Sequence, residues 1–98
     1  MKILSWNVNG IRAVEKKGFI DYVRNSNYDI IGIQETKAQP DQLSEELLNI
    51  EGYKSYFKWA EKKGYSGVAI YSKEEPIEVS DMGVSDFDNE GRVIIAKY

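Results

Sequence analysis

The chain has 98 residues, 42% of them hydrophobic and 30% charged, which is typical of one globular domain and excludes an intrinsically disordered protein. It contains no Cys and no His, so disulfides, thiolate zinc sites and Ser-His-Asp or Cys-His catalysis are excluded, and a reducing compartment such as the cytoplasm is expected. The net charge of −3 argues by itself against a nucleic-acid binder, and no apolar run approaches the ~20 residues that a membrane-spanning helix needs.

The first half of the chain predicts two strands, each followed by a helix. Residues 2–8 are rich in β-branched and aromatic side chains and end at the turn dipeptide Asn9-Gly10. Apolar side chains then recur at nearly helical spacing between residues 12 and 25, although Gly18 weakens this helix by roughly 1 kcal/mol. Residues 29–34 form the short apolar run of a strand covered on both faces. A second helix is predicted from Pro40 to a stop at Gly52.

The second half predicts three more strands, at residues 54–59, 67–72 and 92–98, and Pro76 restricts the segment after the second of them to an edge or a loop. The order β-α-β-α-β-β-β predicts an α/β fold, a mixed sheet with helices on one face. The last strand is hydrophobic and runs to Tyr98, with nothing after it to pair or cover it. We therefore expect a chain that is truncated at its carboxyl end.

Charge is unevenly spread along the chain. Residues 54–63 carry four Lys and one Glu among several aromatic side chains, whereas residues 74–90 carry seven acidic residues and no basic one. One interpretation is a surface that faces phosphate, followed by a solvated acidic rim. The alternative is an aromatic core strand with solvated Lys side chains at its edges, and charge alone does not separate the two.

Polar residues follow the first two predicted strands where those strands end. Asn7 closes the first strand and Glu35 follows the second. Ligands commonly bind at the carboxyl ends of neighbouring strands, and Mg²⁺ takes oxygen ligands with only one or two carboxylates. Lys37 has the charge to neutralise these acids or to meet a phosphate. The alternative is a turn-forming Asn and a solvated Glu-Thr-Lys loop.

Four segments together resemble the signature blocks of the exonuclease III type of abasic-site endonucleases: Ser5–Ala13, Asp29–Lys37, Gly64–Ala69 and Glu90–Ile94. They occur in the family's order and spacing and run through the whole chain. This resemblance implies the endonuclease/exonuclease/phosphatase fold, a four-layer α/β sandwich of two packed sheets. Residues 1–98 would then be the amino-terminal half of that sandwich.

The resemblance also implies roles for individual residues. Glu35 would be the catalytic carboxylate that holds Mg²⁺ (or Mn²⁺) against the scissile phosphate, with Asn7 beside it as a second catalytic and metal-site residue. Asn9 stands where relatives have Asp or Asn, and its uncharged amide is the weaker ligand. The DNA-binding residues would be Arg12, Lys37, Gly64 and Tyr65.

Structural alternatives stand beside these roles. Arg12 is expected to cap or solvate a helix if it does not bind DNA, and Tyr65 to pack in the core. Trp6 is expected in the core, Gly67 as a close-packing glycine, and Glu90 with Arg92 as a structural ion pair.

The activity implied by the resemblance is metal-dependent hydrolysis of the DNA backbone in base-excision repair. The substrate would be double-stranded DNA, cut 5′ to abasic sites, with 3′-5′ exonuclease activity in many relatives. The family's downstream Tyr, Asp-Phe-Asn and Asp-His blocks are absent, so we expect this chain alone to be inactive. The alternatives are another phosphodiesterase or phosphatase of the same fold, such as an inositol-phosphate phosphatase or sphingomyelinase, and an incompetent half-fold that forms a homodimer through its uncovered sheet.

Overall fold

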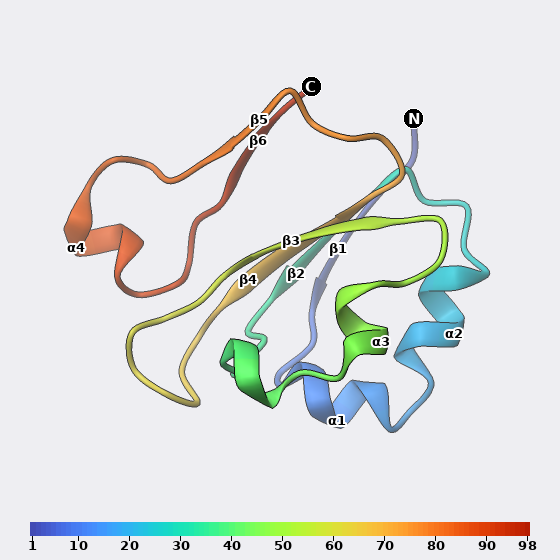
Figure 1. Cartoon of the computed structure of the whole chain (residues 1–98), viewed down its shortest axis with the longest axis horizontal. Helices are drawn as coiled ribbons and strands as arrows, with labels where there is room; N and C mark the ends of the chain where they lie inside the picture. The colour runs from blue at the N-terminus through green and yellow to red at the C-terminus, as the bar shows by residue number, and fades with distance from the viewer.

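Four strands form the central sheet of the computed structural model, which describes all 98 residues (Figure 1). The strands are β1 (Ile3–Asn7), β2 (Ile30–Gln34), β3 (Lys54–Lys58) and β4 (Val68–Ser72), and their order across the sheet is β1-β2-β4-β3. β1 and β2 are parallel, while β4 is antiparallel to both of its neighbours, so the predicted mixed sheet is confirmed. Asn7 stands opposite Gln34, which brings the carboxyl ends of β1 and β2 to one edge.

The helices α1 (Ile11–Glu15), α2 (Phe19–Arg24) and α3 (Glu45–Leu48) gather on one side of this sheet (Figure 1). Two of them, α1 and α2, carry the crossover that a parallel pair of strands requires. The expectation of one helix from residue 12 to 25 is wrong, because Gly18 adopts φ 96°, a left-handed conformation that ends one helix and starts the next.

The expectation of one helix from Pro40 to Gly52 is also wrong. A 3₁₀ turn (Pro40–Gln42) is followed by extended backbone at Leu43, and α3 then starts afresh. Ser44 caps this new helix, since its hydroxyl accepts a hydrogen bond from the Leu47 amide at 3.1 Å. The local capping preference of Ser therefore outweighs the helical spacing of the leucines around it.

The core lies between the sheet and these helices. Ile31 and Ile33 of β2, Tyr71 of β4, Phe19 of α2 and Leu47 of α3 are all at most 2% exposed. The Phe19 ring lies 5.3 Å from that of Trp6 and 5.9 Å from that of Tyr71. Trp6 therefore packs against the core from β1, as the sequence predicts. This contact holds the end of β1 against the helix layer.

A second, smaller sheet forms near the carboxyl end. Two antiparallel strands, β5 (Glu78–Ser80) and β6 (Ile95–Lys97), are joined through the short helix α4 (Ser85–Asp88). The last predicted strand is thus shorter than residues 92–98 and lies outside the main sheet, where it is paired by β5, a strand that precedes it in the chain. Neither β5 nor α4 was predicted, because segments of three or four residues show no measurable periodicity.

The face of the sheet opposite the helices is partly covered. Residues 92–94 line a hollow of about 310 Å³ with residues of β2 and β4, and Val68 and Ser72 are buried on this face. Ile3 of β1 stays 63% exposed. Association of two copies through this face stays a prediction. No helix of the chain is long and apolar enough to cross a bilayer.

Candidate functional site

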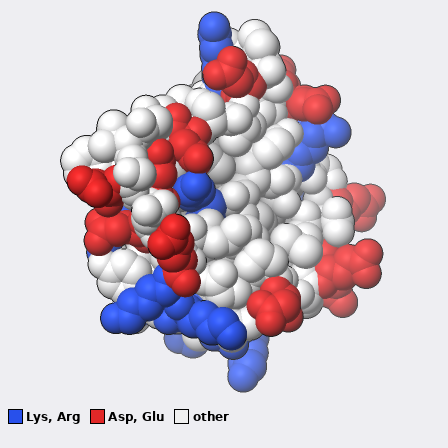
Figure 2. Space-filling model, turned by 60° about the vertical axis from the view of Figure 1, so that its left-hand side comes forward, with Lys and Arg blue, Asp and Glu red and all other residues white.

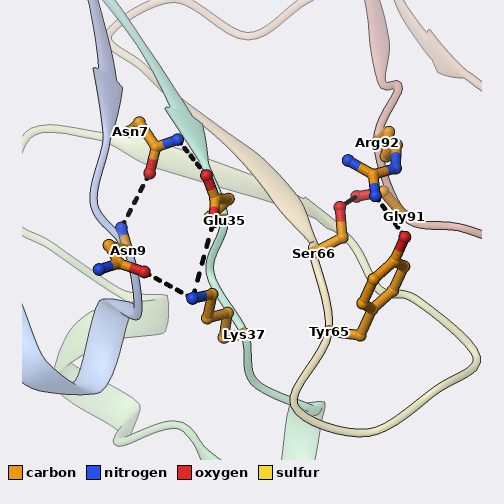
Figure 3. Close-up of polar contacts among 8 residues, drawn as sticks. All are labelled: Asn7, Asn9, Glu35, Lys37, Tyr65, Ser66, Gly91 and Arg92. Atoms are coloured by element: carbon orange, nitrogen blue, oxygen red, sulfur yellow. Dashed lines mark hydrogen bonds and ion pairs between the residues drawn. The ribbon is translucent and has the colours of Figure 1, made fainter.

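Asn7 and Glu35 meet at the edge where β1 and β2 end. Asn7 is the last residue of β1, and Glu35 comes directly after β2. The Asn7 side-chain amide donates a hydrogen bond to the Glu35 carboxylate (Figure 3). The parallel pairing of the two strands brings these side chains together although 27 residues separate them.

Lys37 and Asn9 complete a ring of polar side chains around this contact (Figure 3). The Lys37 Nζ donates to the Asn9 Oδ1 at 2.5 Å and lies 3.6 Å from the Glu35 Oε1. The Asn9 backbone amide donates in turn to the Asn7 Oδ1 at 3.0 Å. The side chains of Glu35 and Lys37 are 40% and 39% exposed, so a ligand reaches both of them from solvent.

The site keeps Glu35 ionised. The hydrogen bond from Asn7 lowers the pKa of the Glu35 carboxyl below its usual value, and the positive charges of Lys37 and Arg92 lower it further. A hydrogen-bond donor and nearby cations both stabilise the charged form of a carboxyl group. An ionised carboxylate is the form that binds a cation.

Replacing Asn7 by Ala should raise the pKa of Glu35 toward its usual value, because the largest stabilising contact of the carboxylate is lost. A carboxyl with a lowered pKa stabilises the folded chain above its unfolded pKa and loses that contribution as the pH falls through its folded pKa. The stability difference between wild type and Asn7→Ala should therefore shrink on acidification through that range. A carbon-detected NMR titration of Glu35, combined with urea unfolding at several pH values, measures both effects.

The control is Asn49→Ala, which removes an exposed asparagine whose side-chain amide donates to the Glu45 carbonyl and to no residue of the site. An unchanged Glu35 pKa in Asn7→Ala would contradict the assignment of Asn7 as its main stabilising partner.

The backbone of the site is held in an unusual conformation. Asn9, Glu35 and Lys37 have φ of 47°, 57° and 52°, the left-handed region that side-chain-bearing residues avoid. Such residues cost about 1–3 kcal/mol each and persist where the surrounding structure holds them. Asn adopts this conformation readily, so the strain falls on Glu35 and Lys37.

The donor set suits a hard cation with an incomplete protein shell. One carboxylate, that of Glu35, lies among the amide oxygens of Asn7 and Asn9, and no group of three or more Asp, Glu, His or Cys is present. Mg²⁺ is commonly held by one or two carboxylates, with water and phosphate oxygens as the other ligands. These residues therefore fit Mg²⁺ or Mn²⁺ only as part of a larger coordination shell.

Three of the predicted DNA-binding residues lie around one open hollow. Arg12, Lys37 and Gly64 line it together with α1 and the start of α3, and Lys16 adds another positive charge. No side chain caps the start of α1, and the exposed Arg12 lies within this short helix, so its alternative as a solvated helix residue stays open. Its exposed guanidinium is available to a ligand in this hollow.

Tyr65 is not among the residues that line that hollow, and its hydroxyl faces Arg92 (Figure 3). Its hydroxyl accepts a hydrogen bond from Arg92 and lies 3.5 Å from the Glu90 carboxylate, and the Arg92 guanidinium lies 5.0 Å from its ring centre. Tyr65 is half-buried and outside the hydrophobic core, so the core alternative is wrong. The predicted Glu90–Arg92 ion pair is present at 3.5 Å.

Arg92 is the site residue that the sequence analysis missed. Its charge acts on Glu35, yet it was expected only as a structural ion pair. Its position in the fourth signature block, Glu90–Ile94, was the signal in the sequence that could have pointed to it. Figure 2 shows one group of basic side chains at the lower left, with acidic side chains above it, and further basic and acidic side chains spread over the rest of this face.

Comparison with known proteins gives a consistent result. The chain is 48% identical over 100 residues to an exodeoxyribonuclease of Bacillus subtilis (strain 168), and 39% identical over 99 residues to a DNA-(apurinic or apyrimidinic site) endonuclease of Dictyostelium discoideum. The solved structure of an AP endonuclease from Archaeoglobus fulgidus superposes with a TM-score of 0.80 at 36% identity, over 98% of this chain and 36% of that one.

The matches cover the whole of this chain but only 38% and 27% of the two relatives' lengths. The predicted α/β fold and the predicted resemblance are both confirmed. The model of the endonuclease/exonuclease/phosphatase family matches residues 4–97. The chain therefore belongs to the endonuclease/exonuclease/phosphatase family.

Proposed function

We propose that this chain supplies the metal-holding part of a DNA repair nuclease that cleaves the backbone of double-stranded DNA 5′ to abasic sites, with 3′-5′ exonuclease activity. The observation that carries the proposal is the convergence of Asn7, Glu35 and Lys37 at the carboxyl ends of two parallel strands. The similarity to an exodeoxyribonuclease and to an abasic-site endonuclease supports DNA as the substrate over an inositol phosphate or a sphingolipid.

Each side chain of the site has a part in this proposal. Glu35, with Asn7 beside it, holds Mg²⁺ or Mn²⁺, a cation that supplies stabilisation of the charge that develops on phosphate oxygens. Asn7 orients the Glu35 carboxylate and keeps it ionised. Lys37 anchors the ring through Asn9 and neutralises part of the local negative charge. Arg12, Gly64 and Tyr65 bind the DNA backbone on either side of this centre.

The 98-residue chain should be inactive by itself on abasic-site DNA, because its site offers one carboxylate, that of Glu35, and the chain contains no His. The same residues should become active when they replace the aligned stretch of the Bacillus subtilis exodeoxyribonuclease, to which they are 48% identical. The measurement is Mg²⁺-dependent incision of an abasic-site duplex by the chain alone and by the chimera.

An intact duplex of the same sequence is the substrate control, and an inositol phosphate tests the rival class. A chimera that is folded by circular dichroism but cuts neither duplex would overturn the proposed function. Incision by the 98 residues alone at the rate of the chimera would overturn the expected inactivity.

A further inference from the structure

Thr36 is buried between two half-exposed functional side chains. It is 0% exposed, whereas its neighbours Glu35 and Lys37 both reach solvent and both have left-handed backbone. The direction of the Glu35 side chain is therefore set by how the backbone on either side of Thr36 is held.

This backbone is held from two sides. Four hydrogen bonds of 2.7 to 3.0 Å join it to neighbouring loops: Gly10 N to Glu35 O, Ile11 N to Thr36 O, Thr36 N to Gly67 O, and Lys37 N to Ser66 O. The bonds to residues 66 and 67 tie the site loop to the turn before β4. That turn is tied onward, since the Gly67 amide donates to the Gly91 carbonyl at 2.8 Å.

Thr36 and Gly67 are so closely packed that no side chain fits at residue 67. A Cβ on residue 67 would lie 2.1 Å from the Thr36 Oγ1, far inside any allowed contact. That hydroxyl is buried and has no hydrogen-bond partner, so it acts here by its shape. Buried polar atoms without partners are rare, and a structural reason is expected where one occurs. Gly67 also has φ 89°, which glycine adopts without strain.

We propose that Thr36 and Gly67 form a steric lock that positions the Glu35 carboxylate against Asn7. The side chain of Thr36 fills the space that glycine leaves at residue 67, and this fit keeps the two loops in register. The inference rests on the proposed function, since a metal-holding role is what makes the direction of Glu35 important. Thr36 and Gly67 are positioning residues, because neither of them lines the hollow in which a ligand would bind.

The test uses the 98-residue chain and three variants. Gly67→Ala introduces the clash. Gly52→Ala is the matched control, because Gly52 has φ 87° and an added Cβ would meet nothing within 4 Å. The double variant Thr36→Ala/Gly67→Ala keeps the new Cβ but removes the hydroxyl, leaving the Thr36 Cβ at an ordinary contact distance of 3.4 Å.

Two NMR signals report the lock without metal or DNA. One is the side-chain amide resonance of Asn7, which depends on its hydrogen bond to Glu35, and the other is the amide-to-Hα coupling of Glu35, which depends on φ. We expect Gly67→Ala to shift both, Gly52→Ala to leave both unchanged, and the double variant to restore both. Loss of folding in Gly67→Ala with folding and signals recovered in the double variant also supports the lock.

The lock is overturned if a folded Gly67→Ala keeps both wild-type signals, or if the double variant is as disturbed as Gly67→Ala while Gly52→Ala is unaffected. A parallel titration of the wild-type chimera with Mn²⁺, followed by broadening of the Glu35 resonance, tests the metal role separately. Absence of broadening counts against the proposed function. It does not affect the test of the lock, because the two NMR signals that report the lock need no metal.

Discussion

Glu35→Gln should reduce Mg²⁺-dependent incision by the chimera by about 10²-fold or more, because the change removes the one ionised carboxylate of the site and keeps its size. The amide of Gln cannot replace the charge that a cation needs from this side of its shell. The loss should appear in the rate at saturating DNA, since the DNA-binding residues around the hollow are untouched.

The matched control for this change is Glu46→Gln, which alters an exposed acid on α3 without a contact to the site. Both variants lower the negative charge by one unit, so a general effect of charge on DNA binding would appear equally in both. Incision by Glu35→Gln within a few-fold of the parent chimera would show that Glu35 does not hold the metal.

Phe19→Ala should destabilise the chain by about 3–5 kcal/mol, since it leaves a cavity at the centre of the core. Phe19 is 2% exposed, and its ring contacts Trp6 on β1 and Tyr71 on β4, so it joins the helix layer to two strands of the sheet. A domain of this size has a free energy of unfolding of about 5–15 kcal/mol, so this one change removes a large part of it.

The comparison variant is Phe87→Ala, the same substitution at a phenylalanine that is 52% exposed on α4. Its free energy of unfolding should stay within about 0.5 kcal/mol of wild type, as is usual for surface positions. Urea unfolding followed by circular dichroism measures both variants. Equal losses in the two would mean that the core does not lie where the structure places it.

In the proposed site, some residues meet the ligand and others hold those residues in position. Glu35 and Lys37 reach solvent, while Thr36 between them is sealed against the turn before β4. A strained backbone at both exposed residues is kept in place by hydrogen bonds from two neighbouring loops. The direction of the carboxylate is thus a property of three loops that are far apart in the sequence.

Local patterns in the sequence were enough to predict the main strands and to name a candidate site. Short runs of β-branched and aromatic residues between turn signals place β1, β2, β3 and β4 within one or two residues of their observed ends, because such runs suit a pleated, buried surface. Asn7, Glu35 and Lys37 could be named because polar residues after apolar strands have few structural explanations other than a turn or a site.

Which segments meet could be seen only in the folded chain. Periodicity records which face of a segment is buried and does not record its partner, so the insertion of β4 between β2 and β3 and the pairing of β5 with β6 were not predictable. Local conformations that interrupt a helical pattern, such as the break at Gly18 and the cap at Ser44, were also not predicted. The charge of Arg92 on Glu35 and the fit of Thr36 against Gly67 depend on contacts between distant residues, and these exist only once the chain has folded.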